Sequence, residues 1–356
     1  MGFLKGLYEE VLIFFNFQPV IDLVRSGDYS SLRTLGGIEN VLNPLIPVLL
    51  VIEVVRAVVM RRFTGPQYKI PFFIYIFNRF AGRYLSIAAL AFCVGLFSPY
   101  AIVKTSFTWY WLIYGYIVWE LGHFVYHYLG HKVRLFWCLH STHHAPEHMN
   151  LSVAFAHFIL EAPYADVIRT SVCILLGVNQ PLLFFIMFVD GTWGAFIHVG
   201  DHLMKDGRLG FLNRFILTPS HHRVHHAKNP LYMDTNFCNL LNIWDRVFGT
   251  YRPQRDDIPI VYGITRPVKP GNFLDVYFGE FVALGRDIVK APGLANKLLY
   301  VVMPPGWSHT GDHKTSGVVR REWLEQEAQQ RSLRPEALHG IGHGGPHRLE
   351  TDGEQR

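Results

Sequence analysis

The stretch His127-Tyr-Leu-Gly-His131-Lys-Val-Arg-Leu-Phe-Trp-Cys-Leu-His140-Ser-Thr-His143-His144 decides the reading of this chain, because it holds five histidines. On a helix, residues three or four positions apart lie on the same face. The spacing therefore predicts that His127 and His131 form one pair of imidazoles. It predicts in the same way that His140, His143 and His144 form a triplet pointing to one place.

Two further groups follow at the same spacings. His198 and His202 form a second pair, and His222, His225 and His226 form a second triplet. The four groups supply ten imidazoles, more than the four ligands of one tetrahedral zinc ion. Ten buried imidazoles without a partner would also be costly. We expect the groups to hold two metal ions, and neutral imidazole suits iron, zinc, copper and nickel.

The composition indicates a membrane protein with a substantial soluble part. The chain has 356 residues, of which only 17% are charged, against roughly 25% in soluble domains. Aromatic residues make up 15%, and the mean hydropathy is +0.16. Four widely separated cysteines exclude a disulfide scaffold. The net charge of +5 comes without a basic run with interleaved aromatics, so nucleic acid is not an expected partner.

Apolar runs long enough to cross a bilayer predict several transmembrane helices. Val41–Met60 is one, with Glu53 and Arg56 spaced to pair inside it. Residues 84–103 and 105–119 are expected to form a hairpin. Residues 170–200 are too long for one span, and the turn signal at 179–181 predicts a second hairpin.

The loops predict the orientation of these helices. The loop between the first span and the first hairpin carries five basic residues and no acid, namely Arg61, Arg62, Lys69, Arg79 and Arg83. Such loops face the cytoplasm. The histidine groups then fall on the same side, and we expect an integral membrane protein with its histidine site on the cytoplasmic face.

These expectations give an all-α, polytopic membrane protein of roughly four to five transmembrane helices in hairpins, with a cytoplasmic helical cap that holds a histidine-rich dimetal site. Residues 1–40 are expected to form an amphipathic, interfacial segment, with a helix over 3–20. Residues 41–252 form the catalytic domain in this prediction. Residues 253–315 form a C-terminal cytoplasmic extension, and 316–356 a polar, flexible tail with a short helix over 320–330.

Polar residues near the histidines are candidates to orient the ligand rings through hydrogen bonds. His123 shares a helix face with His127 and Glu120. Asp201 and Asp234 are the other carboxylate candidates, each alternatively a solvated or capping residue. His157 is either such a partner or a plain polar residue.

At these residues the chain resembles the superfamily of fatty acid hydroxylases and sterol desaturases, which are membrane di-iron enzymes. His127 to His144 is similar to the family's HRxxHxxxxLWxxHxxHH, with Tyr128 where the family often has Arg. Asn150 follows at the family's distance and is a further candidate beside the metals. Residues 218–226, 234–237 and 244–250 resemble later family segments. Short Pro/Gly motifs after residue 260 are similar to the alkylglycerol monooxygenase-like branch.

The resemblance implies a non-haem di-iron oxidoreductase. Two iron ions and O2 would oxidise a C–H bond of a lipid such as a sterol, a fatty acyl chain or an ether lipid, by hydroxylation or desaturation. The chain shows no flavin, haem or nicotinamide module, so electrons must come from a separate donor, either tetrahydropterin or an NAD(P)H-linked redox protein. A membrane protein that binds or transports metal ions is the alternative, with the same histidine cluster.

Overall fold

The computed structural model describes residues 6, 8–10, 12, 17–79 and 82–332. Within these residues every regular element is a helix, and the only β pairs are two isolated bridges, Ile216–Leu241 and Ala227–Tyr262. The predicted all-α class is therefore confirmed for this part of the chain.

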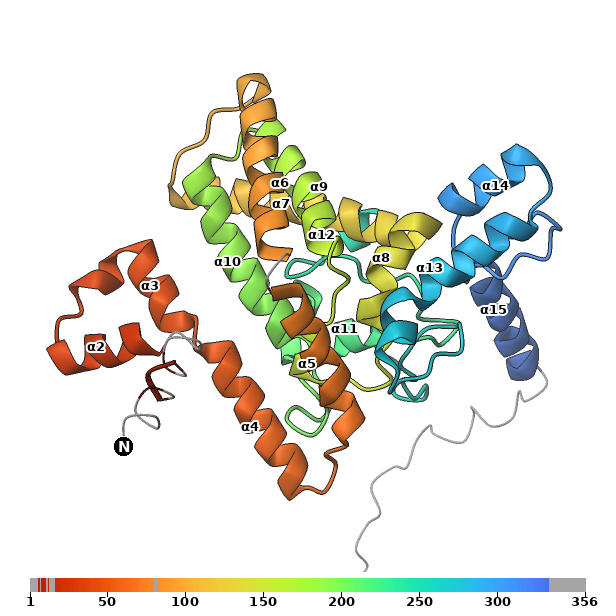
Figure 1. Ribbon diagram of the computed structural model, residues 1–356, viewed down its shortest axis with the longest axis horizontal. Coiled ribbons are helices and arrows are strands. Elements are labelled where there is room, and N and C mark those ends of the chain that lie inside the picture. The colour runs from red at the N-terminus through yellow and green to blue at the C-terminus, as the bar shows by residue number, and fades with distance from the viewer. Residues whose placement is uncertain (1–5, 7, 11, 13–16, 80–81, 333–356) are drawn as a thin grey trace, which may run out of the picture.

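Four α-helices lie between residues 17 and 79; the first two stand apart from the main body of the molecule (Figure 1), whereas the last two pack against it. The four are α2 (Gln18–Ser26), α3 (Leu35–Leu42), α4 (Leu45–Val59) and α5 (Gly65–Arg79). Most of the helix predicted over 3–20 lies outside the described residues. Within them, one helical stretch, Asn40–Val59, is long and apolar enough to cross a membrane. Two shorter apolar helices, Tyr84–Tyr100 and Gly293–Val302, accompany it. By helix length and hydropathy, the described residues therefore contain one candidate span and not the predicted four to five.

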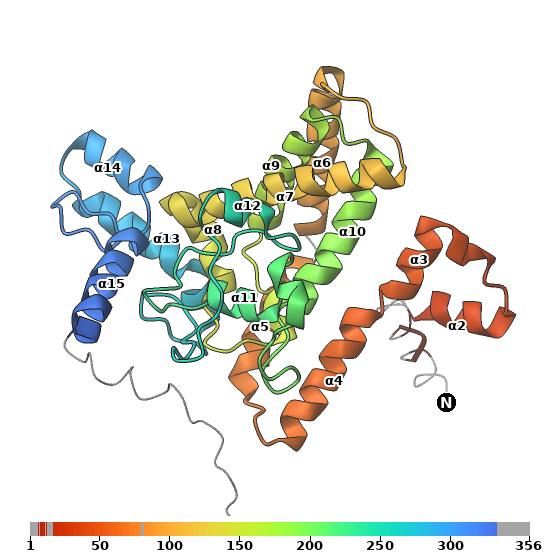
Figure 2. The same cartoon turned by 180° about the vertical axis from the view of Figure 1, so that it is seen from behind.

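Four helices form the bundle that carries the site, and they lie against one another in both views (Figure 2). They are α6 (Gly82–Phe97), α7 (Trp109–Lys132), α9 (Glu161–Leu175) and α10 (Gln180–Phe196). Buried apolar side chains from α7, α9 and α10, among them Trp119 and Leu182, fill its centre. The predicted turn at 179–181 lies where α10 begins: Asn179 caps that helix by accepting from the Leu182 amide, 3.1 Å away.

Helices α7 and α4 meet the rest of the fold in ways that the hydropathy did not predict. Helix α7 continues well past residue 119 and carries Glu120, His127 and His131 on one rigid element. Glu53 on α4 does not pair with Arg56. Its carboxylate accepts from the Leu151 and Gly200 amides, both at 2.7 Å. The Arg56 Nε donates to the carbonyl of His202. The two charges therefore fasten α4 to the loops beside the histidines.

The remaining helices complete the fold. They are α8 (Arg134–His144), α11 (Pro219–His225), α12 (Ile243–Val247), α13 (Phe273–Lys290), α14 (Gly293–Val302) and α15 (Ser316–Ser332). Two of them, α8 and α12, pack on α7, and α13 packs on α8 and α14. The short helix predicted over 320–330 is found as α15, and residues from 333 onward lie outside the described part.

Candidate metal centre

Nine of the ten predicted ligands gather into two buried groups. In the five-histidine group, one ring nitrogen from each member lies within 4.8 Å of the others, and its members are His127, His131, His140, His144 and His225. In the four-histidine group the same holds for His143, His198, His222 and His226. The members come from α7, α8, α11 and the turn after α10. His127 and His131 thus meet in one group as their spacing predicted, whereas each predicted triplet is divided, with His143 and His225 in the other group from their two neighbours.

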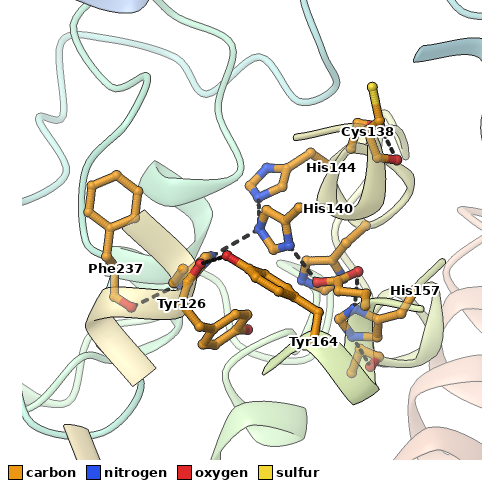
Figure 3. A network of polar contacts seen from close by, with 12 residues as sticks. Tyr126, Cys138, His140, His144, His157, Tyr164 and Phe237 are labelled. Carbon is orange, nitrogen blue, oxygen red and sulfur yellow. Dashed lines mark hydrogen bonds and ion pairs between the residues drawn. The ribbon is translucent and has the colours of Figure 1, made fainter. Parts of the chain in front are cut away.

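Hydrogen bonds at one ring nitrogen fix the proton of several members of the five-histidine group. The Nδ1 atoms of His127 and His225 each lie 2.8 Å from a backbone carbonyl, those of Phe237 and Thr235. The Nδ1 of His140 lies 2.5 Å from a carboxylate oxygen of Glu161 (Figure 3). Carbonyl and carboxylate oxygens only accept, so Nδ1 carries the proton. In a neutral ring, Nε2 is then left with a lone pair.

These lone pairs face one another. The Nε2 of His140 lies 3.0 Å from the Nε2 of His127 and 3.0 Å from that of His144. The Nε2 atoms of His131 and His225 are buried without a hydrogen-bond partner. Two acceptor nitrogens at hydrogen-bond distance repel each other unless a cation lies between them. The donor set therefore fits a metal ion, with imidazole Nε2 as the ligand atom.

The four-histidine group repeats this arrangement. The His198 Nδ1 donates to the Gly194 carbonyl at 2.6 Å. Its Nε2 lies 3.1 Å from the Nε2 of His143 and 2.8 Å from that of His222, and His226 Nε2 is 3.0 Å from His222 Nε2. The two groups adjoin, since the rings of His144 and His226 stack with centroids 4.3 Å apart. Two neighbouring ions fit these residues.

Burial keeps the histidine rings neutral, which is the form that binds metal. It lowers the pKa of His131 to about 4, against the opposing effect of Asp234. Burial and the neighbouring imidazoles hold the pKa values of His143, His144 and His226 well below the ordinary range. No deprotonation of these rings is therefore needed at neutral pH before an ion binds.

Two carboxylates hold ligand rings directly. Asp234 accepts from the His131 Nδ1 at 3.1 Å and also contacts Lys132 and Ser316. Glu161, at the start of α9, accepts from both His140 and His157, the latter at 2.9 Å. Asp234 was a predicted candidate. Glu161 was not, because no short spacing in the sequence links it to a ligand pair.

Other predicted residues lie elsewhere. His202 belongs to neither group, and its Nε2 is 3.8 Å from Glu53. Asp201 is 66% exposed and faces Arg62 rather than a ligand ring. Glu120 accepts from the backbone amides of Asn239, Leu240 and Leu241 at 2.7–3.0 Å. That carboxylate therefore orders a loop beside the site, and in this structure it holds no ligand ring.

The last three candidates also differ in role. His123 lies beside Asp190, with 3.5 Å from its Nδ1 to the carboxylate, and its ring meets that of His127 edge-on. His157 stacks on His143 with ring centroids 4.3 Å apart. Asn150 caps the short helix at 151–155 by accepting from the Ser152 amide at 3.0 Å. His123 and His157 thus touch ligand rings, whereas Asn150 shapes a loop.

Three cavities adjoin the histidine groups. The inner cavity, of about 240 Å³, is lined by members of both groups, including His127, His143 and His198. The apolar cavity, of about 470 Å³, lies between α4, α5 and α10 and shares Phe155, Gly191 and Ala195 with the inner one. The third cavity, of about 410 Å³, reaches His131, His144 and His225 from the side of α13 and α15. Apolar atoms make up most of its surface, and we call it the polar cavity for the charged side chains in its lining, among them Lys228, Arg266 and Glu280.

Comparison with known proteins supports the reading of the motifs. Residues 112–250 match the family model described as fatty acid hydroxylase. No solved structure matches the chain.

Three curated relatives show what kind of protein the chain is similar to. An alkylglycerol monooxygenase of Danio rerio is 34% identical over 212 residues, 57% of this chain and 43% of that protein. The alkylglycerol monooxygenase of Homo sapiens is 31% identical over 203 residues, again 57% and 43%. An ornithine lipid hydroxylase of Rhizobium tropici is 31% identical over 180 residues, 49% of this chain and 51% of that protein.

The matched region thus spans about half or less of each relative's length. All three names denote oxidoreductases, which agrees with the predicted enzyme class. The matched residues contain all nine histidines of the two groups and both carboxylates that hold them. Over residues 112–250 the chain is therefore similar to the fatty acid hydroxylase superfamily, and it resembles the alkylglycerol monooxygenase-like branch.

Proposed function

We propose that this protein is a di-iron, O2-dependent oxidase that hydroxylates a C–H bond of a lipid at the membrane. The observation that carries the proposal is the pair of adjoining groups of acceptor nitrogens. They lie beside a cavity that continues into an apolar one. A dimetal site and an apolar entrance are the two parts that such a reaction needs.

The balance of the reaction defines what the protein must provide. Hydroxylation consumes the lipid, O2, two electrons and two protons, and it gives the alcohol and water. Two iron ions, when bound, would supply the binding of O2 and the oxidising power. The five- and four-histidine groups would hold them. Asp234 and Glu161 keep the rings of His131 and His140 in the orientation that presents Nε2.

The apolar cavity is suited to admit a lipid chain. Leu50 of α4, Phe72 of α5 and Met187 of α10 line it. Because α4 belongs to the one described stretch able to cross a membrane, this opening would face lipid. The lipid chain would then pass Phe155, Gly191 and Ala195 and enter the inner cavity, where it meets the histidines. Gly191 leaves this passage open, since a Cβ at that position would have no neighbour within 4 Å.

The polar cavity is suited to the electron donor. It touches the five-histidine group from the side away from α10, and its lining includes Trp137, Lys228 and Arg266. A water-soluble donor, either a tetrahydropterin or the tip of a redox protein, could approach there without crossing the path of the lipid. Arg61 and Arg62 directly follow the apolar stretch, which supports a cytoplasmic position for this side.

The test combines metal content with isotope transfer. The detergent-solubilised protein should contain two irons per chain by mass spectrometry, and cells making it should incorporate one atom of 18O2 into a lipid alcohol. Replacing His144 and His226 by Ala, one from each group, should remove both signals. His309→Ala is the matched control, because His309 bonds Tyr300 at 2.9 Å, outside both groups. One metal or none in the unaltered protein would refute the proposal and favour the metal-binding alternative.

A further inference from the structure

A fourth cavity lies next to the loop that carries His202, and it takes no part in the proposed reaction. It has a volume of about 410 Å³ and is lined mainly by polar groups. Its residues come from the turn after α4, the start of α5, the loop at 148–150, the loop at 201–205, α11 and the segment 254–262. We call it the basic cavity, because three side chains of fixed positive charge line it: Arg62, Lys205 and Arg223.

Arg223 is the buried anchor of this cavity. It is 3% exposed. Its guanidinium donates to the carbonyls of Lys205, Val199 and Met204 at 2.7–3.0 Å. Its Nε is buried without a hydrogen-bond partner, and among the described residues no carboxylate lies within ion-pair distance of it. The buried carboxylate of Glu53 interacts with Arg223 electrostatically, but its oxygens accept from the amides of Leu151 and Gly200. A buried cation without a directly paired anion is costly, so the cavity is suited to a ligand that brings negative charge.

The other groups around the cavity favour the same ligand. The one acid in the lining, Asp201, already faces Arg62 at 3.5 Å and is exposed to solvent. Burial raises the pKa of Tyr262 to about 12, so its hydroxyl remains a donor. His202 also has a buried Nε2 without a hydrogen-bond partner. Donors of this kind are suited to the several acceptor oxygens of a phosphate.

The position of the cavity relative to the membrane indicates where the anion comes from. The apolar stretch ends at Val59, and Arg62 stands three residues later. The end of an apolar span lies at the level of the lipid headgroups. The same two helices, α4 and α5, line the apolar cavity nearer the other end of α4. A lipid lying along α4 could therefore place its headgroup in one cavity and its chain in the other.

We propose that the basic cavity binds the anionic headgroup of a lipid, with a phosphate monoester as the chemistry it recognises. The inference rests on the proposed function only in taking the substrate to be a lipid. Arg62 and Lys205 would contact the headgroup at the rim, while Arg223, Tyr262 and His202 would contact it from the inner wall. The protein would thus select its lipid by charge at one end as well as by the apolar cavity at the other.

Binding to the detergent-solubilised full chain tests this without any turnover. Native mass spectrometry would compare palmitoyl lysophosphatidic acid, monopalmitoylglycerol and inorganic phosphate. We expect the lysophosphatidic acid to bind at least about tenfold more tightly than the uncharged lipid. The double variant Arg62→Gln/Lys205→Gln should reduce this preference about tenfold and leave monopalmitoylglycerol binding unchanged.

The control is Arg286→Gln/Lys290→Gln, which removes the same two kinds of charge from the exposed side of α13 and should keep the preference. Equal binding of the two lipids, or a preference that survives Arg62→Gln/Lys205→Gln, would overturn the proposal. Inorganic phosphate binding as tightly as the lipid would overturn the lipid assignment. A chain without iron or oxidase activity would leave these ratios unaffected, so the two proposals fail separately.

Discussion

Replacing Asp234 by Asn should loosen one metal ion and leave the other in place. Asp234 has a φ of 54°, a conformation that Asn also tolerates, so the backbone should not change. The substitution keeps an oxygen acceptor but removes the charge that holds His131 and Lys132. A hydrogen bond to a charged group contributes about 1.5–3 kcal/mol and a neutral one about 0.5–1.5. The expected loss of about 1–2 kcal/mol corresponds to roughly 5–30-fold weaker binding, which overlaps the usual effect of removing such a partner.

The assay is a titration of the metal-loaded protein with a chelator, with the metals per chain counted by mass spectrometry. The unaltered protein should lose its ions together, whereas Asp234→Asn should lose the first at a roughly 5–30-fold lower chelator concentration. Asp256→Asn, a substitution of the same kind at a mainly exposed ion pair with Arg208, is the control. If Asp234→Asn behaves like Asp256→Asn, the carboxylate does not support the five-histidine group and the reasoning is refuted.

Three further predictions concern acid, the lipid passage and the fold. The metal-free protein should lose stability as the pH falls from about 6.5 towards 4, because its buried histidines stay neutral when folded and bind protons when unfolded. Each such ring contributes about 1.4 kcal/mol per pH unit, so the unfolding temperature of the metal-free protein should fall steadily over this range. An unfolding temperature that does not change between these pH values would contradict the prediction. Gly191→Leu should fill the junction of the apolar and inner cavities and reduce lipid oxidation at least about tenfold, with unchanged metal content. Gly191→Ala should reduce lipid oxidation only slightly. Equal turnover by the two variants would rule out this passage. Gly177→Ala should lower the free energy of unfolding by at least about 2 kcal/mol, because Gly177 has a φ of 84° and a Cβ there would lie 1.9 Å from the Val103 carbonyl oxygen. The control is Gly95→Ala, where a Cβ meets nothing within 4 Å. Equal melting temperatures of the two variants would show the reasoning to be wrong.

The sequence predicted the part of the site that depends on local spacing. His140 and His144 meet the same group because four residues make about one helical turn, and this holds in any fold. The outcome for His202 differs because it follows α10 in a loop, where the rule of helical faces does not apply. Its direction is set by Glu53, far away in the chain, which accepts from the amide of Gly200.

What the sequence could not reveal are the partners that hold the rings. The carbonyls of Phe237, Thr235 and Gly194 accept from His127, His225 and His198, and every residue has such a carbonyl. Glu161 is distinguished from other acids only by its position at the start of α9, facing α8. Glu53 and Arg56 were predicted to pair because their spacing allows it, but the neighbouring loops offered closer amides and a carbonyl.

The bond between Ser316 and Asp234 has a consequence for how the protein is made. Ser316 opens α15 and contacts the carboxylate that holds His131. The last of the nine histidines, His226, emerges from the ribosome about ninety residues earlier. A growing chain therefore contains all nine histidines well before it contains the helix that braces Asp234. The five-histidine group would therefore be fully braced only once α15 has been made and has packed beside Asp234.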